Sequence, residues 1–211
     1  MHLQLLLLCW PKPIIPFLMN PKSGGSTLKA FSVCIRSCTG KKNLFATYMH
    51  LVRNVKGSYV SLREPCARAE SSYWHLKKAY SDYGECQGTP LPPACAKHWI
   101  HKVNLSQFVE RLPREIPERI NPAGATRHLV VIKPQYYWVE NASRVICTQN
   151  LTAELDSLRR RYAVENKCGN CTNFHTNSHA YASQMTPEIC DAVNKLYSKD
   201  KRLYDKFCGA A

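Results

Sequence analysis

The chain has 211 residues, a length that favours a single domain with its own hydrophobic core. Its 29 lysines and arginines stand against 15 acidic residues, giving a net charge of +14 that attracts polyanions. The basic residues are scattered and no aromatic RNA-binding pattern accompanies them. This distribution argues against nucleic acid as a partner and leaves nucleotides, acidic lipids and acidic polysaccharides.

The beginning of the chain carries a short apolar segment. The run from Leu5 to Trp10 is far shorter than the roughly 20 residues that span a bilayer. We interpret residues 1–13 as a remnant of a signal anchor or an incomplete N-terminus, with a first buried strand as the alternative. Residues 14–211 form the expected single domain, attached to a membrane if an N-terminal anchor precedes it.

Apolar runs of strand length alternate with helical periods along this domain. Continuous runs of this kind are typical of parallel strands buried on both faces, and the alternation predicts an α/β fold. We expect strands at residues 14–19, 58–62, 128–132 and 144–148. Helical spacing marks Leu28–Phe31–Ile35, Ala69–Tyr73–Leu76–Tyr80 and Leu151–Leu155–Leu158–Tyr162, and a last helix runs from Thr186, as its N-cap before Pro187, to Gly209.

The first expected strand leads through a glycine-bearing turn into a helix. The turn reads Asn-Pro-Lys-Ser-Gly-Gly-Ser-Thr and contains Lys22, Gly24 and Gly25. A strand, turn and helix in this order direct backbone N–H groups and the positive helix end at an anion. The Gly-x-x-x-x-Gly-Lys-Ser/Thr order of nucleoside triphosphatases is missing, which argues against an ATP-dependent kinase. A turn without a ligand is the alternative interpretation.

A second anion-binding pattern follows the strand expected at residues 58–62. Arg63 stands at the strand end, Pro65 starts a helix, and Ser71 lies about two turns along it. An arginine fork and a serine hydroxyl can hold one phosphate together, although a salt-bridged arginine and a surface serine remain the alternative. Two such anion-binding patterns at neighbouring strand ends imply a ligand with two separated phosphate groups.

These two segments resemble the Golgi-type carbohydrate sulfotransferases, with the heparan-sulfate 2-O- and chondroitin sulfotransferases as the nearest branch. Pro-Lys-Ser-Gly-Gly-Ser-Thr is similar to their 5′-phosphosulfate loop, and Leu-Arg-Glu-Pro-x-x-Arg-x-x-x-Ser-x-Tyr is similar to their 3′-phosphate motif. The likeness covers residues 14–80 well, the C-terminal helix partly and the middle loosely. It implies a P-loop-like three-layer fold with a short parallel sheet flanked by helices.

The resemblance also implies roles for individual residues. The donor would be 3′-phosphoadenosine 5′-phosphosulfate (PAPS), and the acceptor a carbohydrate hydroxyl, with acidic polysaccharides among the candidates. Lys22 would stabilise the leaving phosphate oxygen, and Arg63 with Ser71 would hold the 3′-phosphate. The 5′-phosphate would lie in the loop formed by Ser23, Gly24, Gly25, Ser26 and Thr27.

The acceptor hydroxyl needs a base, and a neutral histidine suits that task. His50 lies between the two motifs, where the family often carries a His-x-His pair, but Tyr48 replaces the first member. His75 and Glu64 are the alternatives. Sulfuryl transfer itself requires no metal, so we expect none at the site. The competing function is that of a catalytically inactive or truncated relative that acts as a basic glycan-binding module.

Eleven cysteines and four N-glycosylation sequons indicate the secretory lumen, and the family resemblance implies the Golgi within it. Cys86 and Cys95 bracket a proline-rich loop and are a candidate disulfide. Cys168-x-x-Cys171 precedes His175 and His179, but the spacing is too short for a usual zinc finger and favours disulfides. The sequons begin at Asn104, Asn141, Asn150 and Asn170, and the aromatic residues weighed as sugar platforms or as core are Trp74, Trp99, Tyr136, Tyr137 and Trp138.

Overall fold

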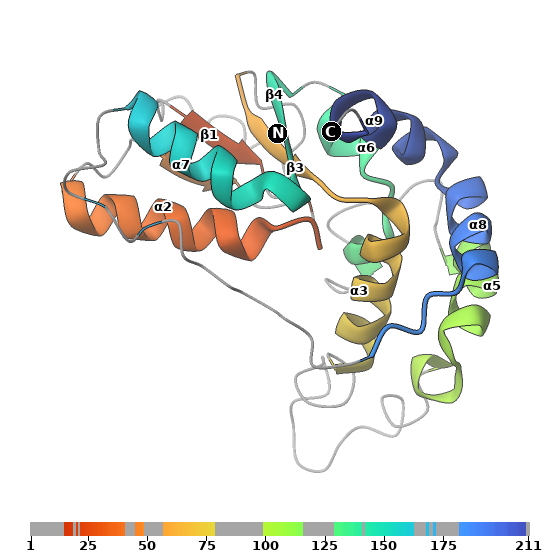
Figure 1. The fold of residues 1–211 in the computed structure, drawn as a ribbon. Coiled ribbons are helices and arrows are strands. Elements are labelled where there is room, and N and C mark those ends of the chain that lie inside the picture. The colour runs from red at the N-terminus through yellow and green to blue at the C-terminus, as the bar shows by residue number, and fades with distance from the viewer. Residues whose placement is uncertain are drawn as a thin grey trace, which may run out of the picture.

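The computed structural model describes residues 15–18, 20, 22–40, 45–48, 57–78, 99–115, 129–140, 142–162, 168, 171 and 182–209. These residues form an α/β fold in three layers, in which helices flank a short parallel sheet (Figure 1). The predicted fold class is therefore confirmed. Within the described ranges, every helix falls short of the length and apolar character needed to cross a membrane.

The sheet has four parallel strands in the order β2-β1-β3-β4. Three of them confirm the predicted runs at 14–19, 58–62 and 144–148, whereas the short strand β2 was not predicted. Leu18 pairs with Val60, and Leu62 pairs with Cys147, so the carboxyl ends of β1, β3 and β4 lie together. The strands are β1 (Ile15–Leu18), β2 (Phe45–Tyr48), β3 (Tyr59–Leu62) and β4 (Arg144–Cys147).

Alternate residues of β1, β3 and β4 supply two separate hydrophobic clusters, one on each face of the sheet. Phe17 and Ile146 belong to one cluster, and Leu18, Val60 and Leu62 to the other. Side chains alternate between the faces of a strand, so an apolar run that serves both faces needs cover on each side. This is why continuous apolar runs, rather than alternating ones, mark these strands in the sequence.

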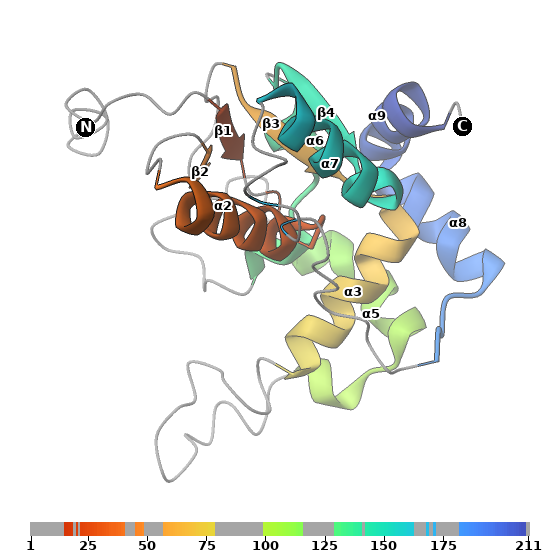
Figure 2. The same cartoon turned by 60° about the vertical axis from the view of Figure 1, so that its left-hand side comes forward.

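Two helices cover the face that carries Phe17. They are α2 (Gly25–Thr39), through Leu28, Phe31 and Ile35, and α7 (Leu151–Arg161), through Leu155 and Leu158. The opposite face is covered by α3, α5, α8 and α9 together with shorter segments (Figures 1 and 2). The elements of that layer are α3 (Pro65–Lys78), η2 (Trp99–Lys102), α5 (Leu105–Glu115), η3 (Leu129–Ile132), α6 (Tyr136–Val139), α8 (Pro187–Leu196) and α9 (Ser198–Cys208), while η4 (Thr148–Asn150) joins β4 to α7.

The strand expected at residues 128–132 is wrong, because residues 129–132 form the 3-10 helix η3. Val131 and Ile132 are buried as an apolar run should be. Their carbonyl oxygens, however, accept hydrogen bonds from side chains: Val131 from the Ser72 hydroxyl at 3.0 Å and Ile132 from the Tyr197 hydroxyl at 2.6 Å. Side-chain donors thus replace the strand neighbour that a sheet would have supplied.

The last helix begins as predicted and then divides. Thr186 caps α8 by accepting a hydrogen bond from the Ile189 N–H, and Pro187 occupies the first turn. The expected single helix to Gly209 is wrong, because Tyr197 leaves helical geometry at φ −102° and ψ 40° and separates α8 from α9. Its buried side chain is held by Ile132. The break directs the first turn of α9, with Asp200, into the core.

Four disulfides join the described parts of the chain, in agreement with the predicted disulfide chemistry. Two of them link α2 to residues 168 and 171, one links α3 to α8, and one links the end of β4 to the end of α9. The pairs are Cys34–Cys171, Cys38–Cys168, Cys66–Cys190 and Cys147–Cys208. The candidate pair Cys86 and Cys95 lies outside the described residues.

Replacement of Cys147 and Cys208 by alanine should lower the free energy of unfolding by about 2–4 kcal/mol, because this bond closes a loop across 61 residues. Urea denaturation of the oxidised protein measures the change. A variant as stable as the wild type would contradict a stabilising role for this bond, and peptide mapping without reduction checks the pairing itself.

Candidate functional site

The candidate site lies where the carboxyl ends of β1 and β3 meet. From β1 the chain passes through α2 to β2 on one side and then reaches β3 on the other side. Such a reversal of direction is the switch point at which open parallel sheets bind ligands. Here α2 begins after β1 and α3 begins after β3, and the two N-terminal ends approach each other in both views (Figures 1 and 2).

The loop between β1 and α2 has an unusual backbone. Lys22 adopts φ 61° and is the one non-glycine residue with a positive φ in the described part of the chain. Gly24 follows with φ 82°, and a Cβ atom there would lie 2.8 Å from Leu151 Cδ2. Gly24 is therefore required twice, by its left-handed conformation and by close packing. A lysine held in this sparsely populated region is a feature that accompanies functional loops.

The start of α2 is open to an anion. Its N-cap is Gly24, so no side chain caps the helix, and the first turn has no acidic residue. The first N–H groups of a helix carry partial positive charge and lack helical partners. Ser26 is exposed in this turn, whereas Gly25 and Thr27 are buried. The arrangement suits a phosphate or sulfate group bound at the beginning of α2.

The second predicted phosphate-binding segment contacts the first. The Arg63 side chain, at the end of β3, donates from Nη1 to the backbone oxygen of Lys22 at 3.3 Å. The two basic residues that the sequence placed on separate motifs are thus neighbours across the strand ends. One small ligand can contact both motifs only if the motifs lie this close together.

The carboxamide of Gln135 joins the two motifs. Its Oε1 accepts hydrogen bonds from Ser23 Oγ at 2.7 Å, from Asn20 Nδ2 at 3.1 Å and from the Arg63 N–H at 3.1 Å. Its Nε2 donates to the Arg63 carbonyl oxygen at 2.7 Å. Asn20 Nδ2 also donates to the Ser61 carbonyl oxygen at 2.9 Å. The Ser23 hydroxyl thus has a protein partner and supports the shape of the loop.

Asp200 fixes Gln135 from behind. Its carboxylate accepts hydrogen bonds from the backbone N–H groups of Gln135, at 2.7 Å, and Tyr136, at 2.9 Å. Burial raises the pKa of Asp200, and the nearby Arg68 guanidinium opposes that rise. Arg68 is itself buried and donates to the Lys133 carbonyl oxygen at 2.6 Å. A chain of buried polar groups therefore runs from α9 through Gln135 to both motifs.

Sequence reasoning missed most of this support. Arg68 stands inside the quoted 3′-phosphate motif, and that position was the one signal available for it. Gln135 and Asp200 belong to segments 65 residues apart, joined through the hydrogen bond between them. No local pattern marks either residue, because their partners come from distant parts of the chain.

The site concentrates positive charge. Burial, and after it the like charges of Arg63 and Arg68, lower the pKa of Lys22 to about 8. Burial also lowers the pKa of Arg63, whereas Glu64 and Glu70 oppose that shift. A bound anion would offset both the desolvation and the repulsion. Two buried polar atoms of the same region, Asn20 Oδ1 and Ser61 Oγ, lack a hydrogen-bond partner among the described residues.

The remaining predicted site residues lie in different surroundings. Ser71 is buried on α3, one turn beyond Arg68. Glu64 accepts a hydrogen bond from the Ala67 N–H at 2.6 Å, so its carboxylate caps α3. His75 is half-buried in α3, and His50 lies outside the described residues.

The aromatic residues mostly serve the core. Trp138 is buried, and Trp74, Trp99 and Tyr137 pack against the larger hydrophobic cluster. Trp99 stacks on Phe108 with ring centroids 6.0 Å apart, so that face of the indole packs against a protein ring. The interpretation of these residues as core fits the described contacts.

Comparisons with known proteins yield no relative. No protein-family model matches the chain, and no curated protein or solved structure shows a significant match. The functional argument therefore depends on the geometry of the site and on its sequence motifs.

Replacement of Gln135 by leucine should lower the free energy of unfolding by about 2–4 kcal/mol, because it leaves several buried polar groups unpaired. The matched control is Gln149→Leu. Gln149 also bonds at both ends of its carboxamide, to the Cys208 carbonyl and the Tyr204 hydroxyl, but it is exposed. We expect less than about 1 kcal/mol there. Equal losses in urea denaturation would contradict a special role for Gln135.

The depressed pKa of Lys22 predicts a pH dependence of stability. Between about pH 8 and 10.5 the folded state has released the Lys22 proton while the unfolded state still binds it, so stability rises with pH in this window. Lys22→Met removes this contribution and keeps all other lysines. The stability of the wild type minus that of the variant should therefore increase from pH 7.5 to 9.5 in urea denaturation. A constant difference would show that the Lys22 pKa is not lowered.

Proposed function

We propose that this protein transfers the sulfuryl group of PAPS to a hydroxyl of a carbohydrate acceptor. The observation that carries the proposal is the meeting of two anion-binding motifs at the ends of adjacent strands, where Arg63 contacts the backbone of Lys22. A nucleotide with phosphate groups at both its 3′ and 5′ positions would engage both motifs. A ligand with a single phosphate would need only one of them.

Each end of the donor has a group of residues suited to it. The open N-terminus of α2, with Ser26 and Thr27, suits the 5′-phosphosulfate, and Lys22 stands beside it to neutralise the leaving phosphate oxygen. Arg63, at the end of β3, and Ser71, on α3 itself, would hold the 3′-phosphate. Gln135 would act as a positioning residue because it bonds to both motifs.

The reaction would follow the logic of phosphoryl transfer, with in-line displacement and fixed positive charge. The acceptor oxygen forms a bond to sulfur as the bond between sulfur and the phosphate oxygen breaks, and adenosine 3′,5′-bisphosphate leaves. The proton of the acceptor hydroxyl passes to a base. His50 remains our candidate for this base, and the engagement of Glu64 as a helix cap makes that alternative less suitable.

Covalent and surface features support a lumenal setting for this activity, and within it we propose the Golgi membrane. Disulfides are stable in oxidising compartments, and four join the described residues. Of the sequon asparagines, Asn104 and Asn150 are described and both are exposed. Asn104 caps α5 through Oδ1, which accepts from the Gln107 N–H at 2.9 Å, so glycan attachment at Nδ2 is compatible with the cap.

Adenosine 3′,5′-bisphosphate should raise the melting temperature by about 5–10 °C at roughly 100 times its Kd, because it binds the folded state alone. Lys22→Ala and Arg63→Ala should each abolish most of the shift. Arg114→Ala, which removes an exposed charge on α5, should keep it and serves as the control. Adenosine 5′-monophosphate, which lacks the 3′-phosphate, should give a much smaller shift.

Transfer of labelled sulfate from PAPS onto a panel of glycans then tests the reaction itself. Nucleotide binding together with transfer supports the full proposal. Nucleotide binding without transfer to any glycan contradicts the catalytic part, and glycan binding without nucleotide binding would favour an inactive glycan-binding relative. Equal stabilisation by adenosine 3′,5′-bisphosphate and adenosine 5′-monophosphate would contradict the proposal that the two motifs bind two separate phosphate groups.

A further inference from the structure

Four cysteines lie together near the C-terminal end of α2, the end opposite to Lys22. Cys34 and Cys38 lie one turn apart near the C-terminal end of α2. Cys168 and Cys171 form a tight turn in which the Cys171 N–H donates to the Cys168 carbonyl at 3.1 Å. Each pair therefore presents its two sulfurs to the other pair.

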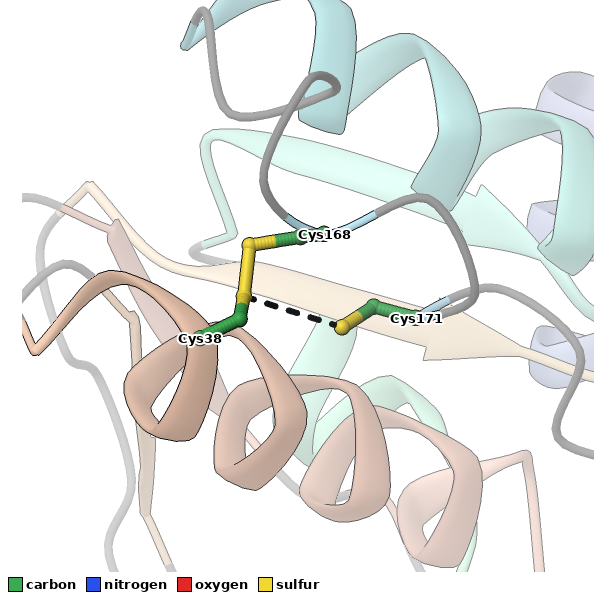
Figure 3. A group of neighbouring side chains, drawn as sticks. All are labelled: Cys38, Cys168 and Cys171. Carbon is green, nitrogen blue, oxygen red and sulfur yellow. Dashed lines mark hydrogen bonds between the residues drawn. A yellow bond between two sulfur atoms is a disulfide. The ribbon is translucent and has the colours of Figure 1, made fainter.

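The four sulfurs form one group rather than two separate bonds. Disulfides connect Cys34 to Cys171 and Cys38 to Cys168. In addition, Cys38 Sγ lies 4.0 Å from Cys171 Sγ, across the two bonds (Figure 3). The sulfurs of Cys38, Cys168 and Cys171 all lie within 4.8 Å of one another, and Cys34 is bonded to one of them.

This arrangement has the ligands and spacing of a structural zinc site. Such sites combine two Cys-x(2–4)-Cys pairs around a tetrahedral ion, and the chain supplies Cys34-x-x-x-Cys38 and Cys168-x-x-Cys171. A zinc–sulfur distance of about 2.3 Å places the sulfurs about 3.8 Å apart. The 4.0 Å between Cys38 and Cys171 is already close to this edge length. Small rotations of the side chains would open the two bonded edges.

We propose that these four cysteines form a thiolate site for one Zn²⁺ whenever the two disulfides are reduced. A dithiol reductant supplies two electrons and two protons to each disulfide and is itself oxidised to a disulfide. Zn²⁺ then displaces the four thiol protons and forms four zinc–sulfur bonds. The metal and the disulfides are alternative ways of making the same connection.

The surroundings favour a closed, structural site. Cys168 and Cys171 are buried in the cluster that contains Phe31 and Leu158, so four protein ligands would leave no open position for catalysis. The ion would keep α2 joined to the segment beyond α7 in a reducing environment. The proposal is independent of the sulfotransferase function, because it concerns the opposite end of α2 from Lys22.

The ligand set differs from the local zinc-finger pattern that the sequence analysis considered and rejected. Local spacing offered His175 and His179 as partners of the Cys168 pair, and both histidines lie outside the described residues. The structure brings Cys34 and Cys38 to that pair instead, across sequence separations of 137 and 130 residues. A second group, Glu64 with Cys66 and Cys190, has three ligands, and its carboxylate is engaged as a helix cap.

The test uses the full chain, reduced with a phosphine under anaerobic conditions and then freed of the reductant. Titration should show one tightly bound Zn²⁺, a zinc-dependent rise in melting temperature, and, with Co²⁺ as the probe, the absorption of a tetrahedral thiolate complex. Two variants separate the metal site from the disulfide. Cys38→His cannot form a disulfide but retains a metal ligand, and Cys38→Ser loses both.

We expect Cys38→His to retain stoichiometric zinc with a shifted cobalt spectrum and Cys38→Ser to lose it. Cys147→Ser, which removes a cysteine outside the group, should bind zinc like the wild type. Should Cys38→Ser fail to fold, the reduced wild type and Cys38→His still decide the question. Absence of stoichiometric zinc from the reduced wild type, an octahedral cobalt spectrum, or equal losses in the Cys38→Ser and Cys147→Ser variants would each overturn the proposal.

Discussion

One carboxamide holds the candidate site together. Gln135 accepts hydrogen bonds from Ser23, Asn20 and the Arg63 N–H and donates to the Arg63 carbonyl, so it connects the loop after β1 to the end of β3. A buried amide leaves few of its hydrogen-bonding positions unused, because each unpaired one carries a desolvation penalty. This one side chain therefore links the two motifs proposed to bind the donor, in addition to the direct contact between Arg63 and Lys22.

Covalent bonds stabilise the elements around this polar network. The disulfides tie α2, α3 and the end of β4 to more distant segments, through Cys34 and Cys38, Cys66, and Cys147. The candidate site brings like charges together, and burial followed by the charges of two arginines lowers the pKa of Lys22. A site that holds like charges together for a ligand gains little stability from them, so rigidity has to come from elsewhere in the fold.

Local rules worked where local chemistry decides the outcome. The apolar runs of β1, β3 and β4, the helical period of α2 and the Thr186 cap of α8 each depend on neighbours within a few residues. They failed at residues 128–132, where burial was correct but distant side chains satisfy the backbone carbonyls and a 3-10 turn replaces the strand. They also failed at Tyr197, where the backbone leaves helical geometry and the side-chain hydroxyl donates to the Ile132 carbonyl oxygen in η3.

The sequence alone determined the fold class and the presence of disulfide chemistry, and it marked the two motifs that we propose bind the donor, because each is written in short patterns of residue type and spacing. It could not determine that Arg63 contacts Lys22, that Gln135 and Asp200 support them, or that Cys34 and Cys38 face Cys168 and Cys171. Those relations join residues that are tens to more than a hundred positions apart. They arise only when the sheet order and the helix packing bring the segments into contact.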